Sequence, residues 1–124
     1  MARTAIVIGA GSAGLTALHA MTQAGFDTIC LERNSSYGGI WLTTRYPKLA
    51  IHSKSLNYRF FDFHSVASVG DSATRAEILA YFADFIQAKG LTGKISYQER
   101  VLDVVYRKGR ATQKCMLVVA QRSA

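Results

Sequence analysis

The sequence lacks several features that would assign it to a class at once. No apolar stretch approaches the roughly 20 residues that a membrane-spanning helix needs, because Gly, His, Arg or Lys interrupts each one, and no membrane association is expected. The 2 cysteines, Cys30 and Cys115, form neither a CxxC nor a CxxxxC pair, which argues against a dithiol redox centre. Each lies in an apolar run, so we expect buried, reduced thiols, and the cytoplasm is the expected compartment.

Metal ligands are also missing in any typical arrangement. The 3 histidines, His19, His52 and His64, lack the spacing of a metal site, and no cluster of carboxylates accompanies them. We therefore predict that the chain holds no metal ion.

Acidic residues are scarce relative to basic ones. The chain has 15 Lys and Arg against 8 Asp and Glu, a formal net charge of +7, and residues 94–124 hold 7 of the basic residues but 2 of the acidic ones. A basic segment of this kind can bind phosphate or nucleic acid. Because no nucleic-acid recognition motif or aromatic stacking platform accompanies it, a solvated hairpin is the favoured interpretation and no nucleic-acid partner is expected.

What the sequence does contain indicates an α/β domain. The 124 residues, 49% of them hydrophobic, suffice for one packed domain, which we place at 1–124. Residues 4–8 predict a central parallel strand buried on both faces, and 26–32 a second strand. A helix between them, 12–23, ends at Gly25 and completes a βαβ unit of the Rossmann type.

The rest of the chain divides into a long irregular segment, a helix and a basic hairpin. Residues 33–70 mix turn formers, aromatic and basic residues without a sustained period, as expected of a binding loop. Thr74 and Glu77 form a capping box at the start of a helix that ends at Gly90. The remaining prediction is a short strand over 94–98 and two strands within 101–120, joined at 108–112 with Gly109 able to adopt a positive φ.

A glycine motif lies between the first strand and the first helix. Gly9, Gly11 and Gly14 match GxGxxG, in which the glycines permit a sharp turn, the approach of backbone N–H groups to a pyrophosphate, and close packing of helix on strand. Glu32 follows Gly14 by 18 residues, where a carboxylate accepts hydrogen bonds from ribose hydroxyls and repels a 2′-phosphate. The loop therefore favours FAD or NAD over NADP, even with Arg33 adjacent. A glycine turn without a ligand stays open as the alternative.

The residues after the second strand favour FAD. Glu32 and Arg33 at the strand end are followed by a GGxW element at 38–41 and then by Tyr46 and Pro47. In this order, behind GxGxxG, they resemble the FAD-binding part of the class B flavoprotein monooxygenases, the group of flavin-containing and Baeyer–Villiger monooxygenases. The resemblance extends over essentially the whole chain. It implies a Rossmann-like FAD-binding domain with a parallel sheet and a small β-meander or hairpin, cut short relative to the family's usual length.

The resemblance also implies a set of cofactor-binding residues. The glycine loop and the start of the helix would hold the FAD pyrophosphate, and the end of the second strand the adenosine ribose. The GGxW element would lie along the middle of the cofactor, and a backbone group in a later strand would lie near the adenine. In chain order these residues are Gly9, Gly11, Ser12, Ala13, Gly14, Glu32, Arg33, Gly39, Trp41 and Val101.

One position departs from the family pattern. Where Baeyer–Villiger members have an aspartate after the YP turn, alignment on Tyr46 and Pro47 gives His52. His52 is therefore the candidate catalytic residue, and a loop histidine with a satisfied hydrogen bond is the alternative. A set of aromatic residues either walls a flavin or substrate pocket or packs the long loop: Trp41, Tyr58, Phe60, Phe61 and Phe63.

The activity implied by the resemblance needs more than these residues. In the family, NADPH reduces FAD, and the reduced flavin forms a C4a-peroxide with dioxygen that oxygenates a small-molecule substrate. The NADPH site requires a second GxGxxG domain, which this sequence does not contain. We therefore expect an FAD-binding, monooxygenase-like protein completed by a second copy or another chain, which would also supply any NADPH site. The alternatives are a small relative with an NADPH-independent oxidase, isomerase or cyclase step, and a non-catalytic nucleotide-binding module.

Overall fold

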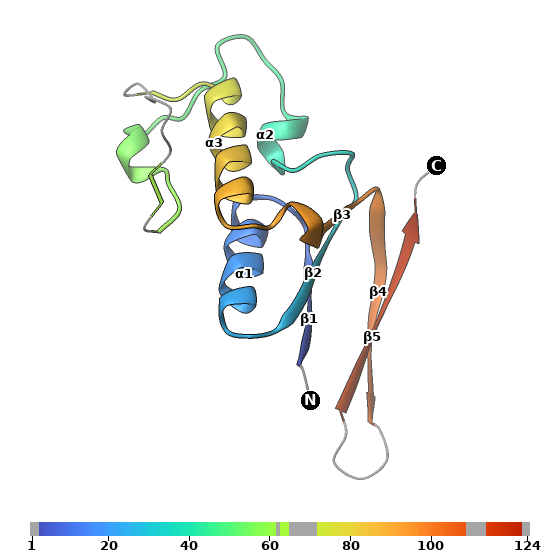
Figure 1. The fold of residues 1–124 in the computed structure, drawn as a ribbon. Coiled ribbons are helices and arrows are strands. Elements are labelled where there is room, and N and C mark those ends of the chain that lie inside the picture. Colours follow the sequence, from blue (N-terminus) through green and yellow to red (C-terminus); the bar gives the residue numbers. More distant parts are fainter. Residues whose placement is uncertain (1–2, 62, 65–71, 109–113, 123–124) are drawn as a thin grey trace.

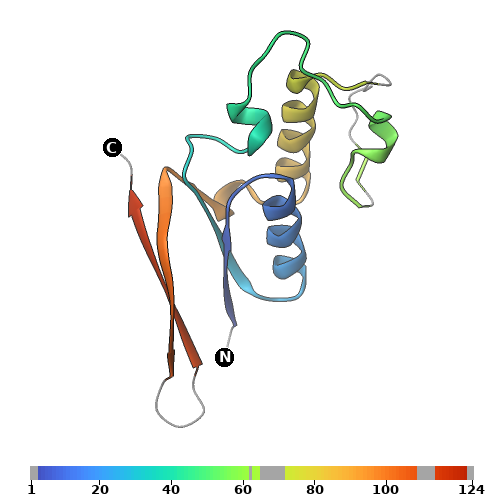
Figure 2. The same cartoon turned by 180° about the vertical axis from the view of Figure 1, so that it is seen from behind.

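A small parallel sheet lies at the centre of the fold. The computed structural model describes residues 3–61, 63–64, 72–108 and 114–122. The sheet has the order β1-β2-β3, with its strands at Thr4–Ile8, Asp27–Glu32 and Ile95–Tyr97. Figure 1 shows the helices on one side of this sheet and a two-stranded hairpin on the other, and the reverse view in Figure 2 shows the same arrangement. The predicted Rossmann-like α/β fold is confirmed.

The first half of the sheet is the predicted βαβ unit. Helix α1, Ser12–Gln23, connects β1 to β2, and the two strands pair in parallel register with Ile6 opposite Ile29. Leu15 and Leu18 on α1 are fully buried in the core. Gly25 follows the helix with φ +86° and donates its N–H to Thr22 O at 3.1 Å, a left-handed helix end that favours glycine.

Strand β1 lies at the edge of the sheet, so the prediction of a central strand buried on both faces was wrong. β2 takes the central position, and Ile6 and Ile8 are 46% and 55% exposed. Ile29 on β2 is exposed on the same face. An apolar β-branched run indicates that a strand favours burial, but it does not determine whether another strand or layer covers it.

The long segment after β2 contains two short helices. Helix α2 spans Ile40–Thr43, η1 spans Ser55–Asn57, and an isolated antiparallel bridge joins Ala50 to Thr74. Arg75 donates from Nη2 to Leu42 O at 2.9 Å and so connects α2 to the long helix that begins at Arg75. The described part of this segment is therefore irregular, as predicted, and these contacts hold it in place.

Helix α3, Arg75–Ala88, is the predicted capped helix. Thr74 Oγ1 accepts from Glu77 N at 3.3 Å, and Glu77 Oε2 accepts from Thr74 N at 2.9 Å, which completes the capping box. Gly90 follows with φ +66°. The buried residues of α3 form the largest part of the core: Ile78, Tyr81, Phe82, Phe85 and Ile86.

The C-terminal part is an antiparallel hairpin in a separate sheet. After η2, Thr92–Lys94, and strand β3, strand β4 spans Glu99–Lys108 and pairs with β5 at Lys114–Arg122. The predicted strands are confirmed: β3 is shorter than the predicted 94–98, and the hairpin extends beyond the predicted 101–120 at both ends. The predicted turn at Gly109 and the side chain of Cys115 lie outside the described residues. In the part of the chain that the structure describes, no helix is long and apolar enough to span a membrane.

Candidate nucleotide-binding crevice

The glycine loop is shaped by a close contact between α1 and β1. Gly9 has φ +94° and donates its N–H to Leu31 O at 2.9 Å, which turns the chain at the end of β1. A Cβ added at Gly14 would lie 1.8 Å from Gly9 O and 2.8 Å from Gly9 C. Only glycine therefore allows α1 to start this close to the turn.

A second pair of glycines packs against this loop. Gly38 donates its N–H to Ala10 O at 2.9 Å. A Cβ added at Gly39 would lie 3.2 Å from Gly11 Cα, and one added at Gly11 would lie 3.6 Å from Gly39 Cα. The GGxW element is thus held against the GxGxxG loop by backbone contact, and neither Gly11 nor Gly39 adds a side chain at their junction.

Glu32 is a buried carboxylate at the end of β2. It is 4% exposed, and its two oxygens accept backbone hydrogen bonds, Oε2 from Ala10 N at 2.6 Å and Oε1 from Asn34 N at 2.9 Å. These two donors stabilise the charge, which would otherwise be costly to bury. A carboxylate offers about four acceptor sites, so both oxygens retain capacity for further donors.

Cys30 lies behind the same loop. Its side chain is fully buried, as predicted, and Sγ donates to Gly9 O at 3.3 Å. Burial raises the pKa of the Cys30 thiol to about 11, and the nearby Glu32 carboxylate adds to the rise. Cys30 is therefore a protonated packing residue at neutral pH, in agreement with the predicted reduced thiol.

Two adjoining cavities bring the predicted cofactor-binding residues together. The first, of about 420 Å³, is here called the glutamate cavity, and it includes Gly9, Gly11, Glu32, Arg33, Gly39 and Val101. The second, of about 410 Å³, is called the glycine cavity, and it includes the same three glycines together with Ser12, Ala13, Gly14 and Trp41. Because they share the glycine loop, the two cavities form one crevice that passes the N-terminus of α1.

His52 lies in a third cavity beside this crevice. This histidine cavity, of about 520 Å³, also contains Tyr46 and shares Trp41 and Tyr58 with the glycine cavity. Trp41 Nε1 donates to Tyr58 Oη at 2.6 Å, and the two rings pack edge to face. His52 is exposed, and among the described residues its side chain has no hydrogen bond. Its catalytic role stays a prediction.

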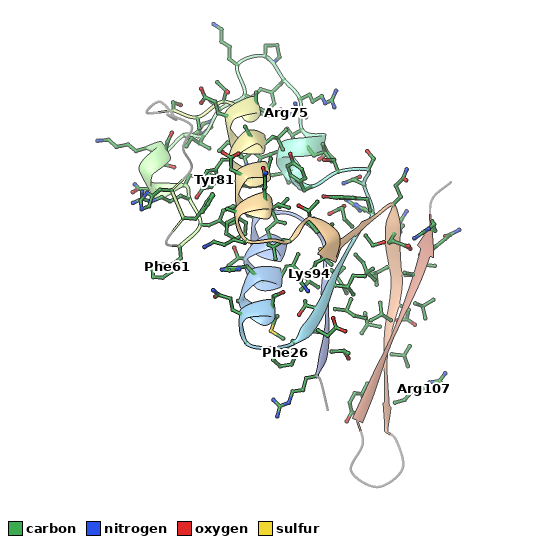
Figure 3. The ribbon with its side chains drawn as sticks, viewed as in Figure 1. Phe26, Phe61, Arg75, Tyr81, Lys94 and Arg107 are labelled. Atoms are coloured by element: carbon green, nitrogen blue, oxygen red, sulfur yellow. The ribbon has the colours of Figure 1, made fainter. Side chains whose placement is uncertain are left out.

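The aromatic residues of the loop divide between the two roles that the sequence left open. Tyr58 walls the crevice with Trp41, whereas Phe60 and Phe63 pack on α3. Tyr81 on α3 fixes them, because its hydroxyl accepts from Phe60 N at 2.9 Å and donates to Phe63 O at 3.0 Å. Phe61 points away from the core and is 96% exposed (Figure 3), at the edge of a further cavity of about 410 Å³ that Phe60 and Tyr81 also line.

Sequence reasoning missed several residues that line the crevice. Glu99 and Arg100, at the start of β4, lie in the glutamate cavity beside Val101, and Ile40 lies in the glycine cavity. Gln98 has a φ of +58°, which turns the chain sharply from β3 into β4 and so brings Glu99 and Arg100 to the cavity. No glycine marks this turn, so it has no local signal in the sequence. Among the described residues, no group of three or more His, Cys, Asp or Glu could hold a metal ion.

Comparisons with known proteins agree with this geometry. The family described as NAD(P)-binding Rossmann-like domain matches residues 7–75. The FAD-binding monooxygenase lolF1 of Epichloe uncinata is 36% identical over 80 residues, covering 62% of this chain and 15% of its own length. The probable FAD-binding monooxygenase AlmA of an Acinetobacter species is 35% identical over 105 residues, covering 82% of this chain and 20% of its own length.

Solved structures give the same result. The open crystal structure of cyclohexanone monooxygenase superposes with a TM-score of 0.79 at 28% identity, covering 84% of this chain and 21% of that one. The chain thus spans between 15% and 21% of the length of these three proteins. It belongs to the NAD(P)-binding Rossmann-like domain family, and its relatives are FAD-binding and flavin-containing monooxygenases.

Proposed function

We propose that this chain binds FAD in the crevice and serves as the FAD-binding part of a flavin-dependent monooxygenase. The adenosine lies in the glutamate cavity, the pyrophosphate in the glycine cavity, and the flavin ring toward the histidine cavity. One observation carries this proposal: the cavities follow one another past the glycine loop, with buried Glu32 at one end and Trp41 at the other.

The residues of the crevice fit the parts of FAD in this order. Gly11 and Gly39 present backbone without side chains, and the first N–H groups of α1 favour the negative charge of a pyrophosphate. Glu32, held by two backbone donors, can accept from ribose hydroxyls. Bound FAD would supply two-electron redox chemistry and the reaction of its reduced form with dioxygen.

The oxygenation of a small-molecule substrate needs an electron source and further active-site groups. We assign the NADPH site and these groups to parts outside this crevice, whether in the same protein, in a second copy or in another chain. A solved structure similar to this chain, a steroid monooxygenase bound to NADP, supports the expectation of a nicotinamide cofactor. His52 is the residue of this chain that we place nearest the reaction, because the histidine cavity adjoins Trp41.

FAD binding can be tested with the single tryptophan of the chain. Trp41 lines the crevice, so bound flavin is expected to quench its emission. FAD should quench at lower concentration than FMN, which lacks the adenosine that Glu32 would bind. Gly11→Ala should weaken FAD binding at least about tenfold, because Gly11 lines both the glutamate and the glycine cavities and the added methyl group would take up space beside the pyrophosphate. Gly93→Ala, with open space around it, is the matched control. Equal quenching by FAD and FMN, or none by either, would contradict the proposal.

A second experiment separates oxygenation from simple nucleotide binding. FAD-loaded protein is reduced with dithionite and mixed with air and a panel of ketones and sulfides. Oxygenated product supports the monooxygenase assignment, and His52→Gln should lower its yield while leaving FAD affinity within about twofold, because His52 is exposed and lies outside the cavities proposed for the adenosine and the pyrophosphate. Tight FAD binding with hydrogen peroxide as the sole product would indicate an oxidase-like or non-catalytic module instead.

A further inference from the structure

The glutamate cavity contains a second carboxylate besides Glu32. Glu99, the first residue of β4, lines this cavity, and its side chain is 16% exposed. The two carboxylates come from different sheets, one from the end of β2 and the other from the hairpin. Residues far apart in the sequence therefore place two negative groups around one small space.

The position of Glu99 is fixed by its neighbour on β5. Arg122 lies opposite Glu99 in the antiparallel register and donates two hydrogen bonds to Glu99 Oε1, from Nε at 2.9 Å and from Nη2 at 2.8 Å. Both bonds end on the same oxygen. Among the described residues no donor is assigned to Oε2, which leaves that oxygen available to a ligand in the cavity.

The backbone couples the two carboxylates through one residue. Asn34 donates its N–H to Glu32 Oε1 at 2.9 Å, and its carbonyl oxygen accepts from Gln98 N at 3.0 Å. Gln98 directly precedes Glu99 and has a left-handed φ of +58°. The turn after β2 thus holds both the buried carboxylate and the start of β4 in place.

We infer that Glu99 is a second specificity residue for the adenosine end of the dinucleotide, selecting a free 2′-hydroxyl over a 2′-phosphate. This inference rests on the proposed function for its ligand class. Glu99 Oε2 accepts a hydrogen bond from the adenosine moiety, and the Glu99 charge, which the 75% exposed Arg122 offsets only in part, adds to that of Glu32 in repelling a phosphate dianion. Arg33 and Arg100 also line the cavity but are exposed, so solvent and salt screen their charges more than those of the less exposed carboxylates.

The test compares two ligands that differ by one phosphate. Isothermal titration of the full chain measures the affinity ratio of ADP to adenosine 2′,5′-bisphosphate. The wild-type chain should prefer ADP, and Glu99→Gln should lower this ratio at least about tenfold, because one charge interaction with the phosphate is lost. The control is Asp103→Asn, which makes the same change in net charge on β4 at an exposed residue outside the cavity and should leave the ratio within about twofold.

A second variant guards against loss of folding. Glu99→Gln combined with Arg122→Gln keeps the net charge of the chain and leaves no guanidinium without its partner, and it should lower the ratio by less than the single change does, because the positive charge of Arg122 is lost as well. An unchanged ratio in both variants, or an equal fall in Asp103→Asn, overturns the inference. If the wild-type chain selects ADP through Glu99 but fails to bind FAD, the proposed function falls and this inference stands. If the chain binds FAD but its affinity ratio does not depend on Glu99, the proposed function stands and this inference falls. If it binds neither nucleotide, both fall.

Discussion

Substituting Gly14 by alanine tests whether the contact between α1 and β1 shapes the crevice. The new Cβ would lie 1.8 Å from Gly9 O, and real Cβ contacts are essentially never shorter than 3.0 Å. The start of α1 and the turn at Gly9 must therefore separate by about 1.2 Å, and the obstacle is backbone, which cannot rotate away as a side chain can. Overpacking of this kind costs about 1–3 kcal/mol, and we expect about 3 kcal/mol here.

Urea unfolding followed by circular dichroism measures this cost. With a slope of about 1–3 kcal/mol per molar urea, a loss of about 3 kcal/mol lowers the midpoint by roughly 1–3 M. Gly93→Ala is the matched control, because a Cβ there meets no atom within 4 Å, and it should stay within about 0.5 kcal/mol of the wild type. A Gly14→Ala midpoint that equals the Gly93→Ala midpoint would refute the reasoning.

Three further predictions concern a cap, a carboxylate and a thiol. Thr74→Ala removes the side-chain acceptor of the α3 capping box and should lower the free energy of unfolding by about 1 kcal/mol in the same assay. Glu32→Gln should lower it by about 1–3 kcal/mol, because the amide cannot accept from both Ala10 N and Asn34 N without turning donors toward one of them; an unchanged midpoint would argue against the two bonds. The raised pKa of Cys30, about 11, means that the folded thiol stays protonated while the unfolded thiol ionises, so stability should fall as the pH rises from about 9 to 11. Urea midpoints across this range should fall less steeply in Cys30→Ala, and parallel slopes would contradict the assignment.

Local sequence patterns were enough to predict the elements around the glycine loop. The βαβ unit, the left-handed Gly25 and the capping box of Thr74 and Glu77 all depend on contacts between residues close in the chain. The spacing from Gly14 to Glu32 predicted a carboxylate at the end of the second strand for the same reason, since it corresponds to the length of one βαβ crossover. These features therefore needed no knowledge of the packing.

The features that the sequence could not predict depend on distant segments. The edge position of β1 is decided by which strands pair with it, and the strand itself does not encode this. Glu99 enters the crevice because Gln98 adopts a left-handed conformation, which non-glycine residues adopt rarely and without a sequence signature. Tyr58 walls the crevice whereas Phe60 packs on α3, and this difference likewise depends on where Tyr81 of α3 lies.

The two walls of the crevice differ in how firmly they are held, because one of them is the hairpin. β4 and β5 form a separate two-stranded sheet, so its ladder can open while the bonds between β1, β2 and β3 stay intact. A ligand that touches both Glu32 and Val101 would bind only the closed hairpin and would oppose this opening. Amide protons of β4 and β5 should therefore exchange with solvent more slowly when the crevice is filled, by a factor that follows ligand concentration. Exchange rates in a strand that extends away from the site would thus measure occupancy at the glycine loop.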